Sequence, residues 1–157
     1  MAHLKKGDKA PAFQLMDQNQ KKVKLSDYKQ NKLLLYFYPK ANTGGCTKQA
    51  LAVRDALGEL SKQGVSALGI SPDTPQLQKK FDDKHTLGFP LLSDPDHKVA
   101  DAYGVWGEKS MYGKKYEGII RSSFLIDTGG KIIEAWYKVS PKDTVPKAMA
   151  ALSDTSE

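Results

Sequence analysis

The sequence predicts an α/β protein in which a central mixed sheet is covered by helices on both faces. Two apolar runs of strand length, residues 32–38 and 65–71, flank a helical pattern over residues 46–62. This order favours a parallel pair of strands joined by a helix. Further on, a strand–turn–strand pattern around residues 127–130 is typical of an antiparallel hairpin. The length of 157 residues suits one domain, and we expect residues 1–157 to form it.

The first part of the chain predicts a β-hairpin, a buried strand and a long helix. Phe13 and Leu15 alternate with polar neighbours, as do Val23 and Leu25, and a polar turn over residues 17–20 separates the two pairs. The apolar strand that follows does not alternate, which is typical of burial on both faces. The long helix has apolar residues at helical spacing and a terminating glycine. These residues are Ala50, Val53, Leu57, Leu60 and Gly64.

A second buried strand and a second helix come next. Residues 65–71 carry apolar side chains on both faces, as a central parallel strand does. Pro75 stands at the first position of the following helix, with Asp73 or Thr74 as its N-cap. We expect the apolar residues of this helix to face the core. They are Leu77 and Phe81.

The last third of the chain predicts shorter elements. A strand over residues 89–92 contains a proline, so we expect it at an edge or a bend of the sheet. A short helix begins near residues 94–96 and ends at Gly104. The other expected elements are an irregular loop over residues 105–118, strands over 119–126 and 132–137, and a helix from about residue 143 with the apolar face Val145, Ala148, Met149 and Leu152. Together the elements predict a three-layer sandwich of the thioredoxin type with an N-terminal β-hairpin.

Composition and charge exclude several classes of function. The net charge is +6, but the lysines are scattered without a block of five like charges, so we expect no nucleic-acid binding. No apolar run approaches the ~20 residues that span a bilayer, and the N-terminus lacks the apolar core of a signal peptide. We therefore expect a cytoplasmic protein without membrane contact. The three histidines are far apart in sequence, so we expect neither a metal site nor a cofactor.

The single cysteine, Cys46, stands where the first buried strand passes through a loop into the long helix. A free cysteine is usually a small buried hydrophobe. Here its near neighbours are polar or glycine, so we expect the thiol to lie away from the core and to react. The N–H groups and dipole of a helix N-terminus favour a thiolate. An ordinary thiol is already a few per cent ionised at neutral pH, so complete ionisation raises a rate by only ~30-fold.

A fast thiol enzyme therefore needs further groups that orient the substrate and stabilise the leaving group. The hydroxyl of Thr43 can face the same pocket as the thiol, and the pair Gly44-Gly45 brings backbone N–H groups close. Pro39 stiffens the loop and excludes water. Each residue also has a simpler interpretation: Thr43 as a helix cap, the glycines as an ordinary turn, and Pro39 as the end of a strand.

The same residues resemble a known family. Pro39-x-x-x-Thr43-x-x-Cys46 matches the active-site motif of peroxiredoxins. The wider sequence around this motif looks like the bacterioferritin-comigratory or Q-type subfamily. The resemblance covers nearly the whole chain in the right order, and its main segments are residues 37–50, 69–73, 90–94, 103–109 and 118–127.

This resemblance implies a thiol peroxidase that reduces hydrogen peroxide and organic hydroperoxides. Cys46 would attack the terminal peroxide oxygen and become a sulfenic acid. Arg121 matches the family's active-site arginine, although on its own it would be taken as a salt-bridge residue in an apolar strand. Thr43, Gly45 and Arg121 would bind the peroxide, and Pro39 would shield the thiol.

The chain departs from the subfamily at two positions. Gly44 stands where the subfamily usually has proline, and Leu51 stands where many members carry a resolving cysteine. Since there is no second cysteine, an intrachain disulfide is impossible. We expect one-cysteine behaviour in which thioredoxin, glutaredoxin, glutathione or a second chain reduces the sulfenate. The resemblance also suggests a monomer.

Three alternatives remain open from the sequence. The first is a peroxide-reactive redox sensor or thiol-relay module on the same fold, which would stall after one equivalent of peroxide. The second is a disulfide reductase, which needs a Cys-x-x-Cys pair and is disfavoured because position 49 is Gln49. The third is a structural domain whose thiol reacts only as slowly as free cysteine.

Overall fold

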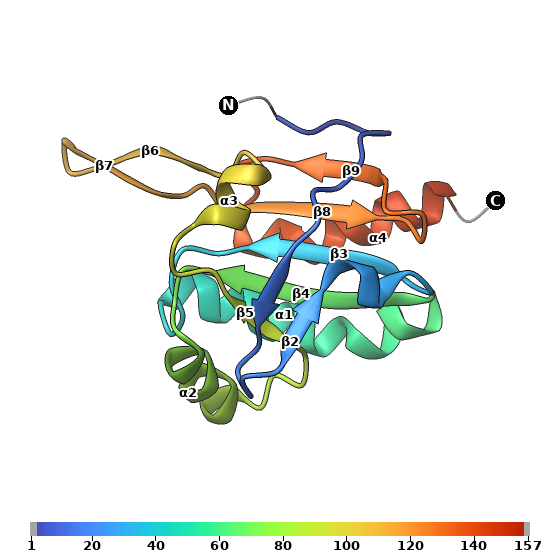
Figure 1. Cartoon of the computed structure of the whole chain (residues 1–157), viewed down its shortest axis with the longest axis horizontal. Helices are drawn as coiled ribbons and strands as arrows, with labels where there is room; N and C mark the ends of the chain where they lie inside the picture. Colours follow the sequence, from blue (N-terminus) through green and yellow to red (C-terminus); the bar gives the residue numbers. More distant parts are fainter. Residues whose placement is uncertain (1–2, 156–157) are drawn as a thin grey trace.

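The computed structural model describes residues 3–155 and contains a seven-stranded mixed sheet and a separate two-stranded sheet within them. The predicted domain bounds, residues 1 and 157, lie outside this range. In spatial order, the strands of the large sheet are β2 (Lys22–Lys24), β1 (Gln14–Met16), β5 (Leu91–Ser93), β4 (Val65–Ser71), β3 (Lys32–Phe37), β8 (Ser122–Ile126) and β9 (Ile132–Trp136). Figure 1 shows β9, β8, β3 and β4 side by side across the molecule.

The strand β3 lies inside the sheet, between β4 and β8, and is buried on both faces. It pairs in parallel with β4 and antiparallel with β8, so that Leu34 lies between Ala67 and Leu125. Successive side chains of a strand point to opposite faces. Leu33 therefore belongs to one apolar cluster, whereas Leu34 belongs to the other. This explains why the sequence of β3 is apolar without alternation.

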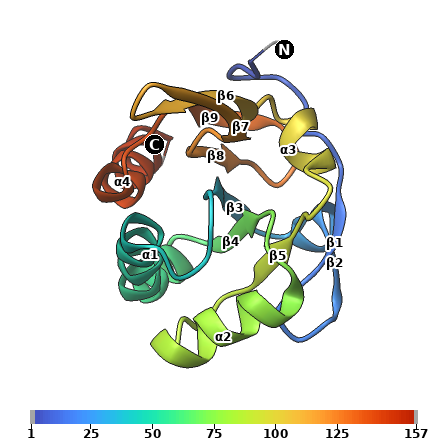
Figure 2. The same cartoon turned by 90° about the vertical axis from the view of Figure 1, so that its left-hand side faces the viewer.

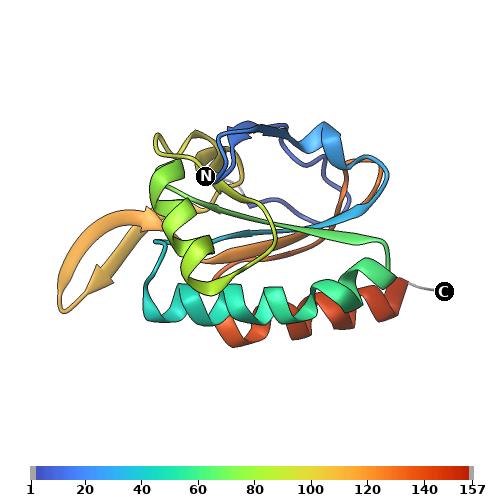
Figure 3. The same cartoon turned by 90° about the horizontal axis from the view of Figure 1, so that it is seen from below.

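Helices cover both faces of the sheet. The helices α1 (Gly44–Lys62), α2 (Pro75–His85) and α4 (Thr144–Thr155) contribute to the cluster on one face, where α1 and α4 run side by side (Figure 3). The short helix α3 (Lys98–Ala102) and the N-terminal segment cover the other face (Figure 2). The predicted three-layer sandwich of the thioredoxin type, with its N-terminal hairpin β1–β2, is confirmed. No helix in the described range is both long and apolar enough to cross a bilayer.

One prediction was wrong in the region taken as an irregular loop. Instead of a loop over residues 105–118, the structure has a hairpin of β6 (Trp106–Met111) and β7 (Lys114–Ile119), which extends from the body of the molecule (Figures 1 and 3). Tyr112 and Gly113 form its turn with positive φ angles of 53° and 79°. The ribbon is mostly exposed, so its sequence lacks the apolar alternation by which strands are recognised.

The short strand and second helix also differ from expectation. The strand β5 was expected at an edge or bend, but it lies between β1 and β4, and its proline precedes the paired residues. The N-terminal hairpin covers the edge that β5 would otherwise expose, which local sequence does not reveal. In α2, Phe81 is buried as predicted, but Leu77 is 44% exposed. The buried polar residue Gln78 occupies the adjacent inward position.

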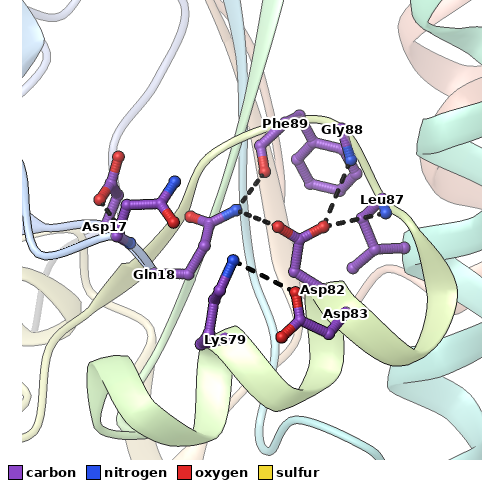
Figure 4. A network of polar contacts seen from close by, with 9 residues as sticks. Asp17, Gln18, Lys79, Asp82, Asp83, Leu87, Gly88 and Phe89 are labelled. Carbon is purple, nitrogen blue, oxygen red and sulfur yellow. Dashed lines mark hydrogen bonds and ion pairs between the residues drawn. The ribbon is translucent and has the colours of Figure 1, made fainter.

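A polar contact across the sheet edge fixes the N-terminal hairpin. Gln18 lies in the predicted turn over residues 17–20 but is only 7% exposed. Its amide donates hydrogen bonds to Asp82 Oδ2 at 3.1 Å and to the carbonyl of Phe89 at 3.0 Å. Its carbonyl accepts from the N–H of Leu91 at 2.8 Å. Asp82 Oδ1 also accepts from the N–H of Leu87 at 3.0 Å, so one network joins the hairpin to the end of α2 (Figure 4).

The substitution Gln18→Ala is expected to lower the free energy of unfolding by about 2 kcal/mol or more. It leaves the Phe89 carbonyl and the Leu91 N–H without their partner in a buried place. Urea unfolding measures the effect, with Asn19→Ala in the exposed part of the same turn as the control. Equal stability of the two variants would contradict a structural role for Gln18.

Candidate active site

Cys46 lies in the first turn of α1, immediately after the loop that leaves β3. Thr43 is the N-cap of this helix, and Asn42 takes a positive φ of 63° where the chain turns into it. The expectation that the thiol lies away from the core was wrong, because Cys46 is 1% exposed and belongs to the apolar cluster beneath α1. Helical periodicity turns Cys46 inward although most of its sequence neighbours are exposed.

The structure brings Arg121 directly to this thiol. Its Nη2 lies 3.5 Å from Cys46 Sγ, although the residues are 75 positions apart. Arg121 stands between the paired segments β7 and β8, rather than inside the continuous strand predicted over residues 119–126. The guanidinium therefore places a rigid, planar N–H donor beside the sulfur. The contact between Cys46 and Arg121 is the centre of the site.

The orientation of Arg121 depends on a residue that sequence reasoning did not assign to the site. Gln49 is fully buried, and its Oε1 accepts a hydrogen bond from Arg121 Nη1 at 2.6 Å. Its Nε2 donates to Thr144 Oγ1 at 2.8 Å, and the Thr144 hydroxyl donates to the carbonyl of Ser140 at 3.2 Å. The chain of contacts therefore leads from α4 to the thiol. The available signal was that Gln49 follows Cys46 by three positions, which places both on one helix face.

The two glycines before the thiol have different surroundings. A Cβ at Gly45 would lie 3.3 Å from Arg121 Nη2 and 3.6 Å from Pro141 Cγ. Any side chain at position 45 would therefore crowd the Arg121 guanidinium. At Gly44 a Cβ would meet nothing within 4 Å. The structure accordingly leaves room for the side chain that the subfamily usually carries there.

The other predicted residues lie in the loop before α1 or in the helix itself, and each has contacts of its own. Thr43 is exposed, and its hydroxyl donates to the carbonyl of Lys40 at 2.9 Å rather than contacting the thiol. Pro39 is half-buried at the start of the loop. Leu51, at the usual position of a resolving cysteine, is half-buried against the cluster beneath α1. The side chain of Thr43 makes no cap hydrogen bond, which leaves the first N–H groups of α1 free of that partner.

A buried network holds the loop at its start and in its middle. The hydroxyl of Tyr38 donates to Gln78 Oε1, and Gln78 Nε2 donates to Ser71 Oγ at 2.8 Å. The Ser71 hydroxyl in turn donates to Asp73 Oδ2 at 2.7 Å, and this oxygen also accepts from the N–H of Ala41 at 2.7 Å. Burial raises the pKa of Tyr38 far above its ordinary value, so the phenol stays neutral and remains a donor. The network fixes the loop from β4 and α2.

A second cation lies close to the site. Lys109, on β6, donates from its Nζ to the carbonyl of Ile119 at 2.8 Å. Partial burial lowers the pKa of Lys109, the charge of Arg121 lowers it further, and Cys46 acts in the opposite direction. Lys109, in the middle of β6, therefore contributes positive charge to the surroundings of Arg121 and Cys46. Among the described residues, no group of three or more His, Cys, Asp or Glu side chains is placed to hold a metal ion.

The substitution Tyr38→Phe is expected to lower the free energy of unfolding by about 1–3 kcal/mol, because Gln78 Oε1 loses its buried donor. Tyr36→Phe is the matched control. The hydroxyl of Tyr36 is buried without a hydrogen-bond partner in the described structure, so its removal should leave stability unchanged or raise it. Urea unfolding distinguishes the variants, and equal losses from both would contradict the network.

Comparisons with known proteins identify the family. The AhpC/TSA family matches residues 6–135. Peroxiredoxin Bcp of Escherichia coli strain K12 is 54% identical over 132 residues, which is 84% of this chain and 85% of that protein. Peroxiredoxin Bcp of Bacillus subtilis strain 168 is 46% identical over 151 residues, or 96% of each chain.

Solved structures agree with the sequence relatives. A cysteine-to-serine mutant of PrxQ from Xylella fastidiosa superposes with a TM-score of 0.93 at 33% identity and covers 100% of both chains. The chain therefore belongs to the AhpC/TSA family and is a thiol-dependent peroxidase, a peroxiredoxin similar to the Bcp and PrxQ proteins.

Proposed function

We propose that Cys46 is the peroxidatic residue of a one-cysteine cycle, activated by Arg121. The observation that supports this most strongly is the 3.5 Å contact between Arg121 Nη2 and the sulfur of the chain's one cysteine. The hydrogen bond from Arg121 Nη1 to Gln49 holds the guanidinium in that place. A planar guanidinium can donate from one nitrogen to the sulfur and from another to Gln49 at the same time. A lysine ammonium lacks this fixed arrangement of donors.

The first half of the cycle reduces the peroxide. The Cys46 thiolate attacks the terminal oxygen of the hydroperoxide, an S–O bond forms and the O–O bond breaks. The sulfur is oxidised to a sulfenic acid, and the leaving oxygen takes a proton to become water or an alcohol. Negative charge develops on that oxygen, where the Arg121 guanidinium and the N–H of Gly45 can donate to it.

Thr43 and Pro39 have supporting roles in this proposal. Because the Thr43 hydroxyl already donates to the Lys40 carbonyl, its oxygen is directed to accept a hydrogen bond from the peroxide O–H. Such an acceptor orients the terminal oxygen towards the sulfur. Pro39 limits water at the half-buried start of the loop.

The second half of the cycle needs a thiol from outside the chain. An external thiol attacks the sulfenic sulfur, water leaves and a mixed disulfide forms. A second thiol then releases Cys46. Thioredoxin, glutaredoxin and glutathione all have the required chemistry. We place this cycle in a monomer and in the cytoplasm, where a reducing thiol pool is maintained.

The redox-sensor alternative predicts the same oxidation but no turnover with a general reductant. No contact in the described structure favours it over the peroxidase.

Peroxide consumption in the presence of a thiol reductant tests the cycle. The wild-type protein should consume many equivalents with at least one of thioredoxin, glutaredoxin and glutathione, whereas Cys46→Ser should consume none above background. A sulfenate-trapping reagent should label Cys46 after one equivalent of peroxide without reductant. If wild type stopped after one equivalent with every reductant, the sensor interpretation would replace the peroxidase.

Substitution of the site arginine should reduce peroxide reactivity strongly. Arg121→Gln is expected to lower kcat/KM by ~10²–10³, the effect of losing a donor to a developing oxyanion. Arg54→Gln removes the chain's other arginine, which pairs with Asp55 on the surface, and should change kcat/KM less than about twofold.

Substitution of Gln49 tests whether the arginine needs its buried partner. Gln49→Leu should lower kcat/KM roughly tenfold, because Arg121 loses the acceptor that orients it. In the Arg121→Gln background, the same substitution should add little. Independent, multiplicative losses would show that Gln49 acts by another route.

A further inference from the structure

A cavity far from the thiol is suited to a ligand of its own. It has a volume of about 680 Å³ and lies between the N-terminal segment and the large sheet. Small-molecule sites commonly measure ~300–1,000 Å³. Leu33 lines the cavity near the beginning of β3, whereas Cys46 follows the other end of that strand, roughly 13 Å farther along it. The two residues also belong to apolar clusters on opposite faces of the sheet, so the cavity is separate from the peroxide site.

The floor and walls of this cavity are apolar. Phe13, Leu33 and Ile126 line it and are among the buried residues of the core. Leu25, from the short 3₁₀ turn after β2, packs against the same cluster. Ala12 is small and exposed, which leaves the entrance open. Such walls favour a hydrocarbon chain or an aromatic ring.

The rim of the cavity is positively charged. Lys9, Lys24 and Lys29 line it, and none of them forms an ion pair within residues 3–155. Asp127 is the one acidic residue among those that line the cavity. Its Oδ1 already accepts hydrogen bonds from two backbone N–H groups of its own turn, each at 2.9 Å. Three lysines against one aspartate leave an excess of positive charge among the lining residues, which complements an anion.

A hydrogen-bond donor lies beside these lysines. Tyr28 lines the cavity, and its hydroxyl makes no hydrogen bond among the described residues. Burial raises the pKa of Tyr28, and the nearby carboxylates of Asp27 and Asp17 raise it further. The phenol thus stays protonated at neutral pH and can donate to a carboxylate oxygen.

We propose that this cavity binds a small amphipathic carboxylate, such as a medium-chain fatty acid. Its hydrocarbon chain lies against Phe13, Leu33 and Ile126, and its carboxylate lies at the lysine rim. The site does not depend on Cys46, so the binding does not rest on the peroxidase cycle.

Titration with octanoate, decanoate and dodecanoate tests the apolar part of the proposal. Calorimetry should show affinity rising roughly tenfold for each pair of methylenes until the cavity is full. Amide signals of Phe13, Leu33 and Ile126 should shift in NMR spectra. Shifts confined to residues 43–46 and Arg121, or no dependence on chain length, would overturn the proposal.

Decanol and charge variants test the lysine rim. Decanol should bind about tenfold more weakly than decanoate, and the triple variant Lys9→Gln, Lys24→Gln, Lys29→Gln should weaken decanoate binding by a similar factor. The matched control replaces three exposed lysines away from the cavity with glutamine. These are Lys62, Lys80 and Lys84. Equal affinity for decanol and decanoate, or equal decanoate binding by both triple variants, would overturn the assignment of the anion.

An occluding variant completes the test. Ala12→Trp should abolish binding by filling the entrance, while peroxide turnover and the thermal unfolding midpoint stay close to wild type. Retained decanoate binding in this folded variant would show that the ligand lies elsewhere. Loss of turnover in Cys46→Ser with unchanged decanoate binding is the expected sign that the two sites are independent.

Discussion

The contact between Arg121 and Cys46 joins two parts of the chain that are 75 positions apart in the sequence. The arginine comes from the junction of β7 and β8, and the thiol comes from the first turn of α1. Gln49 links them to α4 through Thr144. The same short distance therefore requires the antiparallel pairing of β3 with β8 and the packing of α1 beside α4. The sheet and helices have to be in place before the thiol gains its partner.

A second set of contacts, the buried network of Tyr38, Gln78, Ser71 and Asp73, fixes the loop between β3 and α1. The loop between β3 and α1 leaves one of the most buried strands and ends in an exposed turn. Asp73 holds its backbone at Ala41, and Tyr38 anchors its beginning through Gln78. Buried polar groups that satisfy one another in this way favour one arrangement of the backbone. The network from β4 and α2 thus positions the loop that leads into α1, while Arg121 reaches the thiol from the junction of β7 and β8.

Much of the fold could be predicted because its main elements carry local signals. Gly64 ends α1, and Pro75 with Thr74 begins α2, so their boundaries follow from backbone chemistry alone. The β6–β7 hairpin could not be recognised, since a mostly exposed ribbon has no buried face to impose a pattern. The inner position of β5 was also hidden, because it depends on the distant residue Met16 pairing with Ser93.

The site was predictable to a different extent. The position of Cys46 at a helix start follows from the residues themselves, whereas the role of Arg121 entered through family resemblance. Its approach to the thiol is a tertiary contact that spacing does not encode. The burial of Cys46 was missed because polar neighbours were taken to describe the thiol's own surroundings. Gln49 was missed because a buried amide is recognisable only when both of its partners are known.

Because the thiol is almost completely buried, the two reactants of the proposed cycle, a small peroxide and a larger thiol, need different access to it. A small peroxide needs only a narrow path to the sulfur, but a protein or peptide thiol needs the sulfur at the surface. Cys46 is 1% exposed, so in the proposed cycle such a thiol reaches the sulfur only if the first turn of α1 opens. The glycines in that turn make such an opening less costly than it would be in a helix of larger residues.

The two adjacent glycines tolerate substitution to different extents. Position 44 faces open space, so substitutions there alter mainly the stiffness of the chain. Position 45 is limited by the volume of the arginine and of Pro141. Two identical neighbours therefore differ in the substitutions that the structure can accept, since only Gly45 faces a side chain that lies 76 positions away in the sequence.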